Sequence, residues 1–140
     1  HLQVAGHVRA HVVEDWISEF GADRLVIAVD VRDGAIAHKG WLERANLSPS
    51  VFIDSMSRVG ASRFLCTDIN RDGMLGGPNL ELYRSLVSEF PSIKLIASGG
   101  VSQMADIERL ATTGCFAAVV GKALYEGRIA TEQLSRFQRL

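Results

Sequence analysis

The chain has 140 residues and a mass of 15.3 kDa, which suits one domain and is too little for two of ordinary size. Its 15 Lys and Arg residues against 16 Asp and Glu give a net charge of −1, which argues against binding nucleic acid or an anionic membrane by bulk charge. The longest uncharged stretch, residues 110–121, is shorter than the roughly 20 apolar residues of a membrane-spanning helix. Both cysteines lie in apolar runs, as buried reduced thiols do. We therefore expect a globular cytoplasmic domain with no nucleic-acid or membrane partner.

Helical and strand patterns alternate along the chain. Strands are predicted where Val, Ile, Leu and Ala follow one another without strict polar alternation, as in parallel strands buried on both faces. Helices are predicted where amphipathic stretches end at Gly or Pro. In chain order the pattern predicts a helix at 11–20, strand 25–31, helix 49–59, strand 64–69, helix 79–90, strand 93–98, helix 102–113, strand 116–121 and helix 131–139. Such alternation indicates βα units around a parallel sheet.

A weak internal repeat supports this architecture. At an offset of 39 residues, segment 21–34 aligns with segment 60–73 with six identities. Repeated βα units are typical of a (β/α)₈ barrel or of an open doubly wound sheet. A whole barrel needs about 250 residues, so four βα units correspond to half of one. We predict an α/β fold forming a single domain over residues 1–140, with residues 1–11 irregular.

The end of the first predicted strand carries a carboxylate. Functional sites of parallel βα folds lie at the carboxyl ends of the strands, and this strand ends in Asp30. Period-two alternation places Ala28 and Asp30 on one face, and the repeat aligns Ala28 with Thr67 of the second strand. We therefore expect Asp30 and Thr67 to point into one central mouth. An Asp that caps a loop or helix is the alternative, but the position of Asp30 favours catalysis.

The long loop after the second strand, residues 70–78, contains Asp72 and Gly73. Asp-Gly and Gly-Gly pairs often do no more than form turns. Glycine-rich loops above a rigid sheet also bind ligands. The loop is therefore a candidate substrate loop, with Asp72 as its carboxylate.

Glycine turns follow the third and fourth strands. Backbone amides in such turns and at a helix N-terminus suit a phosphate group, and barrel enzymes frequently hold phosphate after their last two strands. Either turn alone is more often only backbone geometry. The two together, in this order, predict a phosphate site made by Ser98, Gly99, Gly100, Gly121 and Lys122.

Three other features of the sequence give weaker evidence of function. Trp41 follows the first strand and serves either ordinary packing or stacking on a flat ligand ring. His7 and His11 have the spacing of metal ligands on a helix, but no third ligand is near in the sequence, so no metal site is expected. The sequence has no Walker A, GxGxxG, CxxC or GxSxG motif.

Five segments occur in an order and spacing that resemble one family. They are VIAVDVRDG, AHKGW, CTDINRDGMLGGPN, IASGGVS and VVGKALYEG. From about Val13 to the C-terminus the chain resembles the second half of the HisA family of histidine biosynthesis, the phosphoribosylformimino-5-aminoimidazole carboxamide ribotide isomerases; the first ten or so residues lie outside the resemblance. The resemblance implies a (β/α)₈ barrel of two similar halves, with this chain forming strands 5–8. It also implies an Amadori rearrangement of an aminoaldose to an aminoketose on a bisphosphorylated small molecule, without cofactor or metal.

The resemblance gives each candidate residue a role. Asp30 is the implied general acid that protonates the ring oxygen, and Thr67 orients the reacting sugar. Asp72 and Gly73 lie on the substrate loop, and Trp41 stacks on the imidazole. One of the two phosphates is held by the glycine turns already named, with Lys122. Opening the ring needs a proton donor, and moving hydrogen from C2′ needs a base on the opposite side.

The family's general base is an Asp on the first barrel strand, and its other phosphate site lies in the first half; neither region is in this sequence. A half barrel exposes apolar strand edges, so we expect a homodimer or pairing with an N-terminal half barrel. One alternative is a catalytically incomplete half-barrel fragment that binds phosphate and self-associates. Another is the sister cyclase of the same pathway, against which Thr67, AHKGW and GKALYEG favour the isomerase. A variant acting in both histidine and tryptophan synthesis also stays open.

Overall fold

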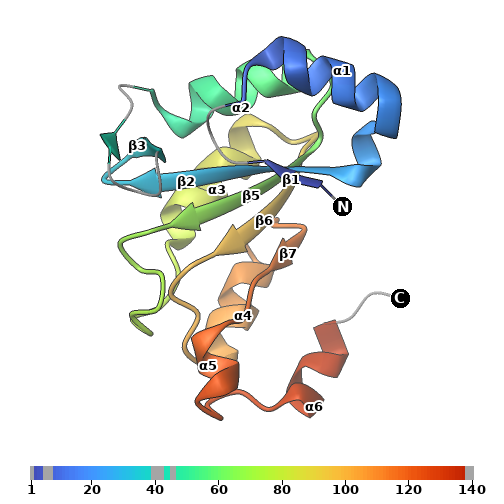
Figure 1. Cartoon of the computed structure of the whole chain (residues 1–140). Coiled ribbons are helices and arrows are strands. Elements are labelled where there is room, and N and C mark those ends of the chain that lie inside the picture. The colour runs from blue at the N-terminus through green and yellow to red at the C-terminus, as the bar shows by residue number, and fades with distance from the viewer. Residues whose placement is uncertain (1, 5–7, 39–42, 45–46, 138–140) are drawn as a thin grey trace.

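A five-stranded parallel sheet forms the framework of the structure. The computed structural model describes residues 2–4, 8–38, 43–44 and 47–137. Within them the parallel strands are β1 (Leu2–Val4), β2 (Leu25–Arg32), β5 (Arg63–Asp68), β6 (Lys94–Ser98) and β7 (Ala117–Ala118), neighbours in that order. Because the spatial order follows the chain order, each crossover moves one strand further in the same direction (Figure 1). A doubly wound sheet reverses direction at its middle, so this is the winding of a barrel.

The crossovers between these strands are helical. They are α1 (Ala10–Phe20), α2 (Pro49–Arg58), α3 (Leu80–Glu89) and α4 (Met104–Ala111), and α3 passes behind β5 and β6 in Figure 1. Ser48 and Asn79 cap α2 and α3 with side-chain oxygens that accept the N–H of Val51 and Leu82. The short helices α5 (Lys122–Tyr125) and α6 (Thr131–Leu134) follow β7, and single 3₁₀ turns occupy Ala22–Arg24 and Ser135–Phe137. The predicted helices are confirmed, with ends that differ by one or two residues except at the C-terminus, where the predicted helix is α6 and a 3₁₀ turn.

Three parts of the sheet differ from the sequence prediction. The first eleven residues are not irregular throughout, because Leu2–Val4 pairs in parallel with Leu25–Ile27 and α1 begins at Ala10. This pairing satisfies backbone groups that an edge of β2 would otherwise expose. A hairpin of β3 (Ala35–His38) and β4 (Glu43–Arg44) continues from the end of β2 in antiparallel pairing. The predicted last strand is reduced to the two residues of β7, which has β6 as its one partner among the described strands.

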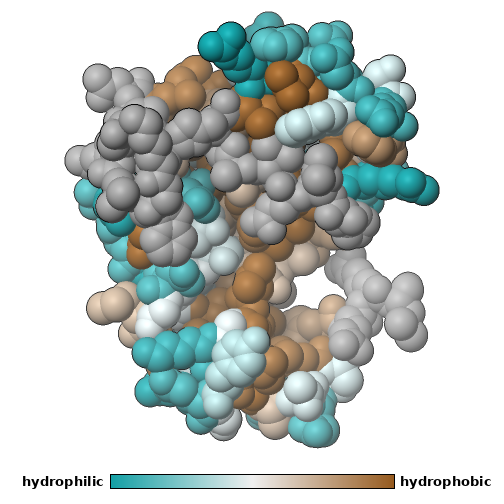
Figure 2. Space-filling model, viewed as in Figure 1, coloured by the Kyte–Doolittle hydropathy of each residue, from teal (hydrophilic) through white to brown (hydrophobic). Residues whose placement is uncertain are grey.

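The two faces of the sheet have different surroundings. Side chains such as Val29, Phe64 and Leu95 are at most 1% exposed and pack against the helices in one core. Val26, Leu65 and Ile96 alternate with them and point to the other face, where they stay partly exposed. Figure 2, seen from the same side as Figure 1, shows apolar residues gathered in a band along the middle of this face. The sheet therefore has one closed, helix-covered face and one open face.

The start of α4 depends on a buried carboxylate. Asp106 is fully buried, and its Oδ2 accepts the N–H of Ser102 at 2.9 Å, the hydroxyl of Ser102 at 2.7 Å and the N–H of Gln103 at 3.3 Å. Arg109 donates to Oδ1 of the same carboxylate. Burial by itself raises the pKa of Asp106, but the hydrogen bonds from Ser102 and Arg109 outweigh it and hold that pKa below the ordinary value. These contacts fix Ser102 and Gln103, which lie shortly after the Gly99–Gly100 turn.

Two leucines on opposite faces test this description. We expect Leu95→Ala to lower the free energy of unfolding by about 2–5 kcal/mol, because it empties a closed core. Leu65→Ala removes the same atoms from the open face and is expected to cost about 1 kcal/mol. Urea unfolding of the two variants measures both values. Equal losses would contradict an open face on this side of the sheet.

The lowered pKa of Asp106 predicts a pH-dependent effect. We expect Asp106→Asn to lower the free energy of unfolding by about 1–3 kcal/mol at neutral pH. Because the folded-state pKa is depressed, this contribution is present above the unfolded pKa of about 3.9 and is lost as the pH falls through the folded pKa. Urea unfolding of wild type and variant at a series of acidic pH values should show the difference shrinking. A difference that stays constant down to the acid limit would be incompatible with the lowered pKa.

Candidate active site

Three polar side chains form one row across the sheet. The strand register pairs Asp30 with Thr67, and Thr67 with Ser98. Register partners in a parallel sheet point to the same side, so the row lies on the open face at the carboxyl ends of β2, β5 and β6. Thr67 is 8% exposed, while Asp30 and Ser98 are half-buried. The structure thus brings together Asp30 and Thr67, as the sequence predicted.

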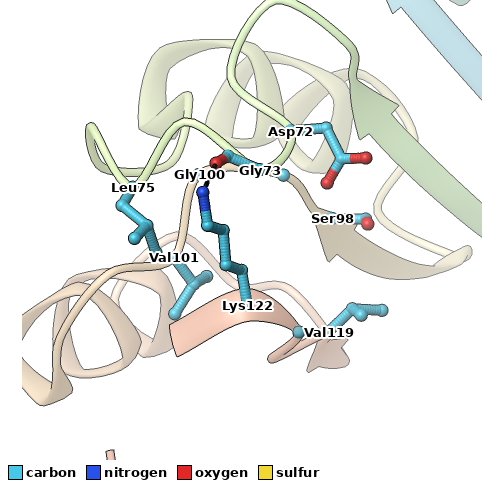
Figure 3. A pocket seen from close by; sticks show the side chains of 10 residues that line it. Asp72, Gly73, Leu75, Ser98, Gly100, Val101, Val119 and Lys122 are labelled. Atoms are coloured by element: carbon cyan, nitrogen blue, oxygen red, sulfur yellow. Dashed lines mark hydrogen bonds between the residues drawn. The ribbon is translucent and has the colours of Figure 1, made fainter. Parts of the chain in front are cut away.

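A hollow opens beside this row. It encloses about 310 Å³, including the part that is open to solvent. Three segments meet in it: the loop between β5 and α3, the turn between β6 and α4, and the turn between β7 and α5 (Figure 3). Seven of the predicted site residues line it, namely Asp72, Gly73, Ser98, Gly99, Gly100, Gly121 and Lys122.

Lys122 bridges two of these segments. In Figure 3 its side chain rises towards Gly73, whose carbonyl oxygen accepts a hydrogen bond from Lys122 Nζ at 3.2 Å. Glu126 lies one helical turn further on, with its Oε1 3.6 Å from the same nitrogen. Asp72 lies above the end of β6 in the same view, on the side of Ser98. The hollow therefore has a cation on one wall and a carboxylate on another.

The Gly99–Gly100 turn packs backbone against backbone. Both glycines have positive φ, +101° and +84°, which L-residues with a side chain rarely adopt. A Cβ at Gly99 would lie 2.7 Å from the carbonyl oxygen of Asp68, and a Cβ at Gly100 would lie 2.4 Å from that of Gly77. From the sequence we expect the missing side chains to let a ligand approach the backbone. In the structure that space is filled by the neighbouring loop, whose Gly77 N–H donates to the Gly100 carbonyl at 2.9 Å.

The amide groups of this turn take no part in the backbone hydrogen bonds that close the described loops around them. Gly99 and Gly100 are buried, and among the described residues none of the backbone hydrogen bonds that close these loops uses the N–H of Gly99, Gly100 or Val101 as its donor. Buried amides in folded proteins nearly always have an acceptor. An anion in the hollow, next to Lys122, would supply one.

Tyr83 holds the end of β6 from behind, and sequence reasoning missed it. Its side chain is fully buried, and its hydroxyl donates to the carbonyl oxygen of Ser98 at 2.5 Å. Burial raises the pKa of Tyr83 well above its ordinary value, so the hydroxyl stays protonated and able to donate. In the sequence, Tyr83 is one apolar position of an amphipathic helix, and nothing marks its hydroxyl as the partner of a strand end.

Some predicted features cannot be placed. Trp41 and His7 lie outside the described residues. In the part of the chain that the structure describes, no three His, Cys, Asp or Glu side chains come together as metal ligands. In the same part, no helix is both long enough and apolar enough to cross a membrane.

The comparison with known families agrees with this geometry. The model of the family described as histidine biosynthesis protein matches residues 5–130. The chain belongs to this family. The match starts at residue 5, so it includes part of the first ten or so residues that the sequence comparison placed outside the resemblance. The fold of the family is a (β/α)₈ barrel, and the parallel strands described above are part of one.

Similar proteins from several bacteria share one name. A protein of Flavobacterium johnsoniae is 42% identical over 126 residues, one of Streptococcus thermophilus 45% over 121, and one of Bacteroides fragilis 43% over 122. Each is called 1-(5-phosphoribosyl)-5-((5-phosphoribosylamino)methylideneamino) imidazole-4-carboxamide isomerase. The alignments cover 86–90% of this chain but only 51–52% of each relative. The chain therefore spans about half the length of the relatives that it matches.

The close packing of Gly100 leads to a testable expectation. Gly127 has a positive φ of +69° with nothing within 4 Å of an added Cβ, so Gly127→Ala should cost about 1–2 kcal/mol of unfolding free energy through strain alone. Gly100→Ala should cost a further 1–3 kcal/mol, roughly, because the Gly77 backbone must move. It should also weaken binding of inorganic phosphate, which Gly127→Ala leaves unchanged. Urea unfolding measures the loss of stability, and calorimetric titration measures the affinity for phosphate. Equal losses of stability and equal phosphate affinities in the two variants would refute the close packing.

Proposed function

We propose that this chain supplies the carboxyl-terminal half of a histidine-biosynthetic isomerase. The reaction is the Amadori rearrangement of N′-(5′-phosphoribosylformimino)-5-aminoimidazole-4-carboxamide ribotide, an aminoaldose, to the aminoketose. The observation that carries the proposal is the row of Asp30, Thr67 and Ser98 beside the hollow that Lys122 lines. Relatives that bear the isomerase name match nearly all of this chain, which supports the same assignment.

Asp30 is the proposed general acid. Opening the sugar ring needs a proton on the ring oxygen as the C–O bond breaks. Asp30 is half-buried at the end of β2 and faces the same side as Thr67. In this proposal Thr67 orients the reacting sugar, and Trp41 stacks on the imidazole. The base that removes hydrogen from C2′ comes from outside this chain, on the opposite side of the substrate.

The hollow is the proposed site of one substrate phosphate. Among the described residues, no loop-closing backbone hydrogen bond is donated by Gly99 or Gly100, and the Lys122 side chain lies on the adjoining wall. Backbone amides together with one cation suit a phosphate ester. Asp72 and Gly73, on the loop above, border the sugar that carries this phosphate.

The proposed partner is an N-terminal half barrel. The open face carries a band of apolar residues, and Phe116 and Val119 beside β7 are 59% and 41% exposed. A closed barrel has no free strand edges, and a second half would cover both the edges and the open face. A second copy of this chain is the competing occupant. In either case the assembly is proposed to work in the cytoplasm on a small bisphosphorylated substrate.

Turnover of the aminoaldose tests the proposal. We expect the purified chain to be inactive alone and active when an N-terminal half barrel of a relative is added. Asp30→Asn should lower kcat of that mixture by about 10²–10⁴-fold, because a positioned acid contributes this much. Asp54→Asn, on the exposed side of α2 where Asp54 pairs with Arg58, is the control and should leave turnover unchanged.

Each other result has a defined meaning. Full activity of Asp30→Asn would remove Asp30 from the acid role. Turnover by the chain alone would show that a second copy supplies the base. If no mixture is active although phosphate binds, the chain is a catalytically incomplete half barrel.

A further inference from the structure

Asp68 is a buried carboxylate that the proposed chemistry leaves without a role. It follows Thr67 on β5 and therefore points to the opposite, helix-covered face of the sheet. The residue is 6% exposed. Burying a carboxylate costs free energy unless hydrogen bonds compensate for the lost water, so its partners show what it does.

The Asp68 carboxylate ties together the two ends of the 70–78 loop. Its Oδ1 accepts the N–H of Asn70 at 3.1 Å, at the start of the loop. Its Oδ2 accepts Nδ2 of Asn79 at 2.6 Å, at the end of the loop, where Asn79 also caps α3. The Arg71 guanidinium lies near the same oxygen, with its Nε at 3.7 Å.

The same residue connects this loop to the Gly99–Gly100 turn. The Asp68 carbonyl oxygen accepts the N–H groups of Arg71 and Asp72 at 3.1 and 3.0 Å, which fixes the position of Asp72. Arg71 Nη1 donates to the carbonyl of Gly77 at 3.0 Å, and the Gly77 N–H donates in turn to Gly100. The Asp68–Arg71 ion pair and these hydrogen bonds thus connect Asp68, through Arg71 and Gly77, to the carbonyl of Gly100 in the turn that borders the hollow.

We infer that Asp68 is a positioning residue for the phosphorylated end of the substrate. It does not line the hollow; it holds Asp72 and the Gly99–Gly100 turn where the phosphate ester binds. This inference rests on the proposed function and deepens it. The residues that line the hollow bind the ligand, whereas Asp68 sets the shape of the loop that they depend on.

Swapping the residues at positions 68 and 79 separates this positioning role from an effect on overall stability. In Asp68→Asn, either orientation of the new amide sets its NH₂ group against a donor, Asn79 Nδ2 or the Asn70 N–H. The double variant Asp68→Asn with Asn79→Asp lets the amide at 68 donate to the carboxylate at 79. That carboxylate still caps α3, because Asp is as good a capping residue as Asn. Ile53→Val, on the buried face of α2, is a control that lowers stability without changing the loop.

Two measurements on the full 140-residue chain give the readout. Hydrogen exchange of the Arg71, Asp72 and Gly77 amides, followed by NMR, reports the order of the loop. Calorimetric titration with inorganic phosphate reports the affinity of the hollow for phosphate. In Asp68→Asn we expect both the exchange rates and the Kd for phosphate to rise about tenfold, the effect of losing one hydrogen bond to a charged group. The double variant should return to within about twofold of wild type, and Ile53→Val should leave the Kd unchanged.

The outcomes separate this inference from the proposed function. Unchanged exchange and unchanged phosphate affinity in Asp68→Asn would overturn the positioning role. So would a double variant that stays as impaired as the single one, or a Kd that rises equally in Ile53→Val. The wild type could also bind no phosphate, while Asp68→Asn still speeds amide exchange in the loop and the double variant restores it. That result would contradict the phosphate site but support the role of Asp68 in positioning the loop.

Discussion

The parallel pairing of β2, β5 and β6 is the constraint on which the rest of the structure depends. Parallel strands bring all their carboxyl ends to one edge of the sheet, so polar residues that end each strand gather there. The register then decides which of them become neighbours, and it sets Asp30, Thr67 and Ser98 side by side. A slip of one residue would turn one of these side chains into the helix-packed core. The hydrophobic pattern that builds the core therefore also orients the candidate site.

Backbone packing gives the glycine turn its shape. Gly99 and Gly100 leave no room for a Cβ because the carbonyls of Asp68 and Gly77 occupy that space. The turn and the 70–78 loop consequently form one packed unit, whose atoms have little freedom to move separately. A site built from backbone amides needs such support, since an amide cannot change rotamer to follow its ligand. Tyr83 gives the neighbouring Ser98 carbonyl the same kind of support from the helix layer.

The two faces of the sheet explain why this half of a barrel holds part of a site. Its helix-covered face buries enough apolar surface to form a continuous core from α1 to α4. Its other face combines apolar side chains with the polar row, as the inner wall of a barrel does near its mouth. In the proposed function the same surface serves the chemistry at one end and packs against a partner along the rest of its length.

Sequence patterns alone determined the alternation of helices and strands and the face on which Asp30 and Thr67 lie. Both are local, because period-two alternation and helix caps are set by neighbouring residues. The internal repeat aligns Ala28 with Thr67, whereas the sheet pairs Asp30 with Thr67. This stagger of two residues changes the level in the strand but not the face, so Asp30 and Thr67 still point to the same side of the sheet.

Only the tertiary structure decided which groups support the site. The pairing of Leu2–Val4 with β2, the short β7, and the contacts of Asp68, Tyr83 and Gly77 all join segments far apart in the chain. The clearest case is Asp68. Its side chain lies on the helix-covered face of β5, and its hydrogen-bond donors come from a loop whose path no local pattern specifies. Hydrogen bonds across such distances depend on how whole elements pack, and this is the information that a single sequence does not carry.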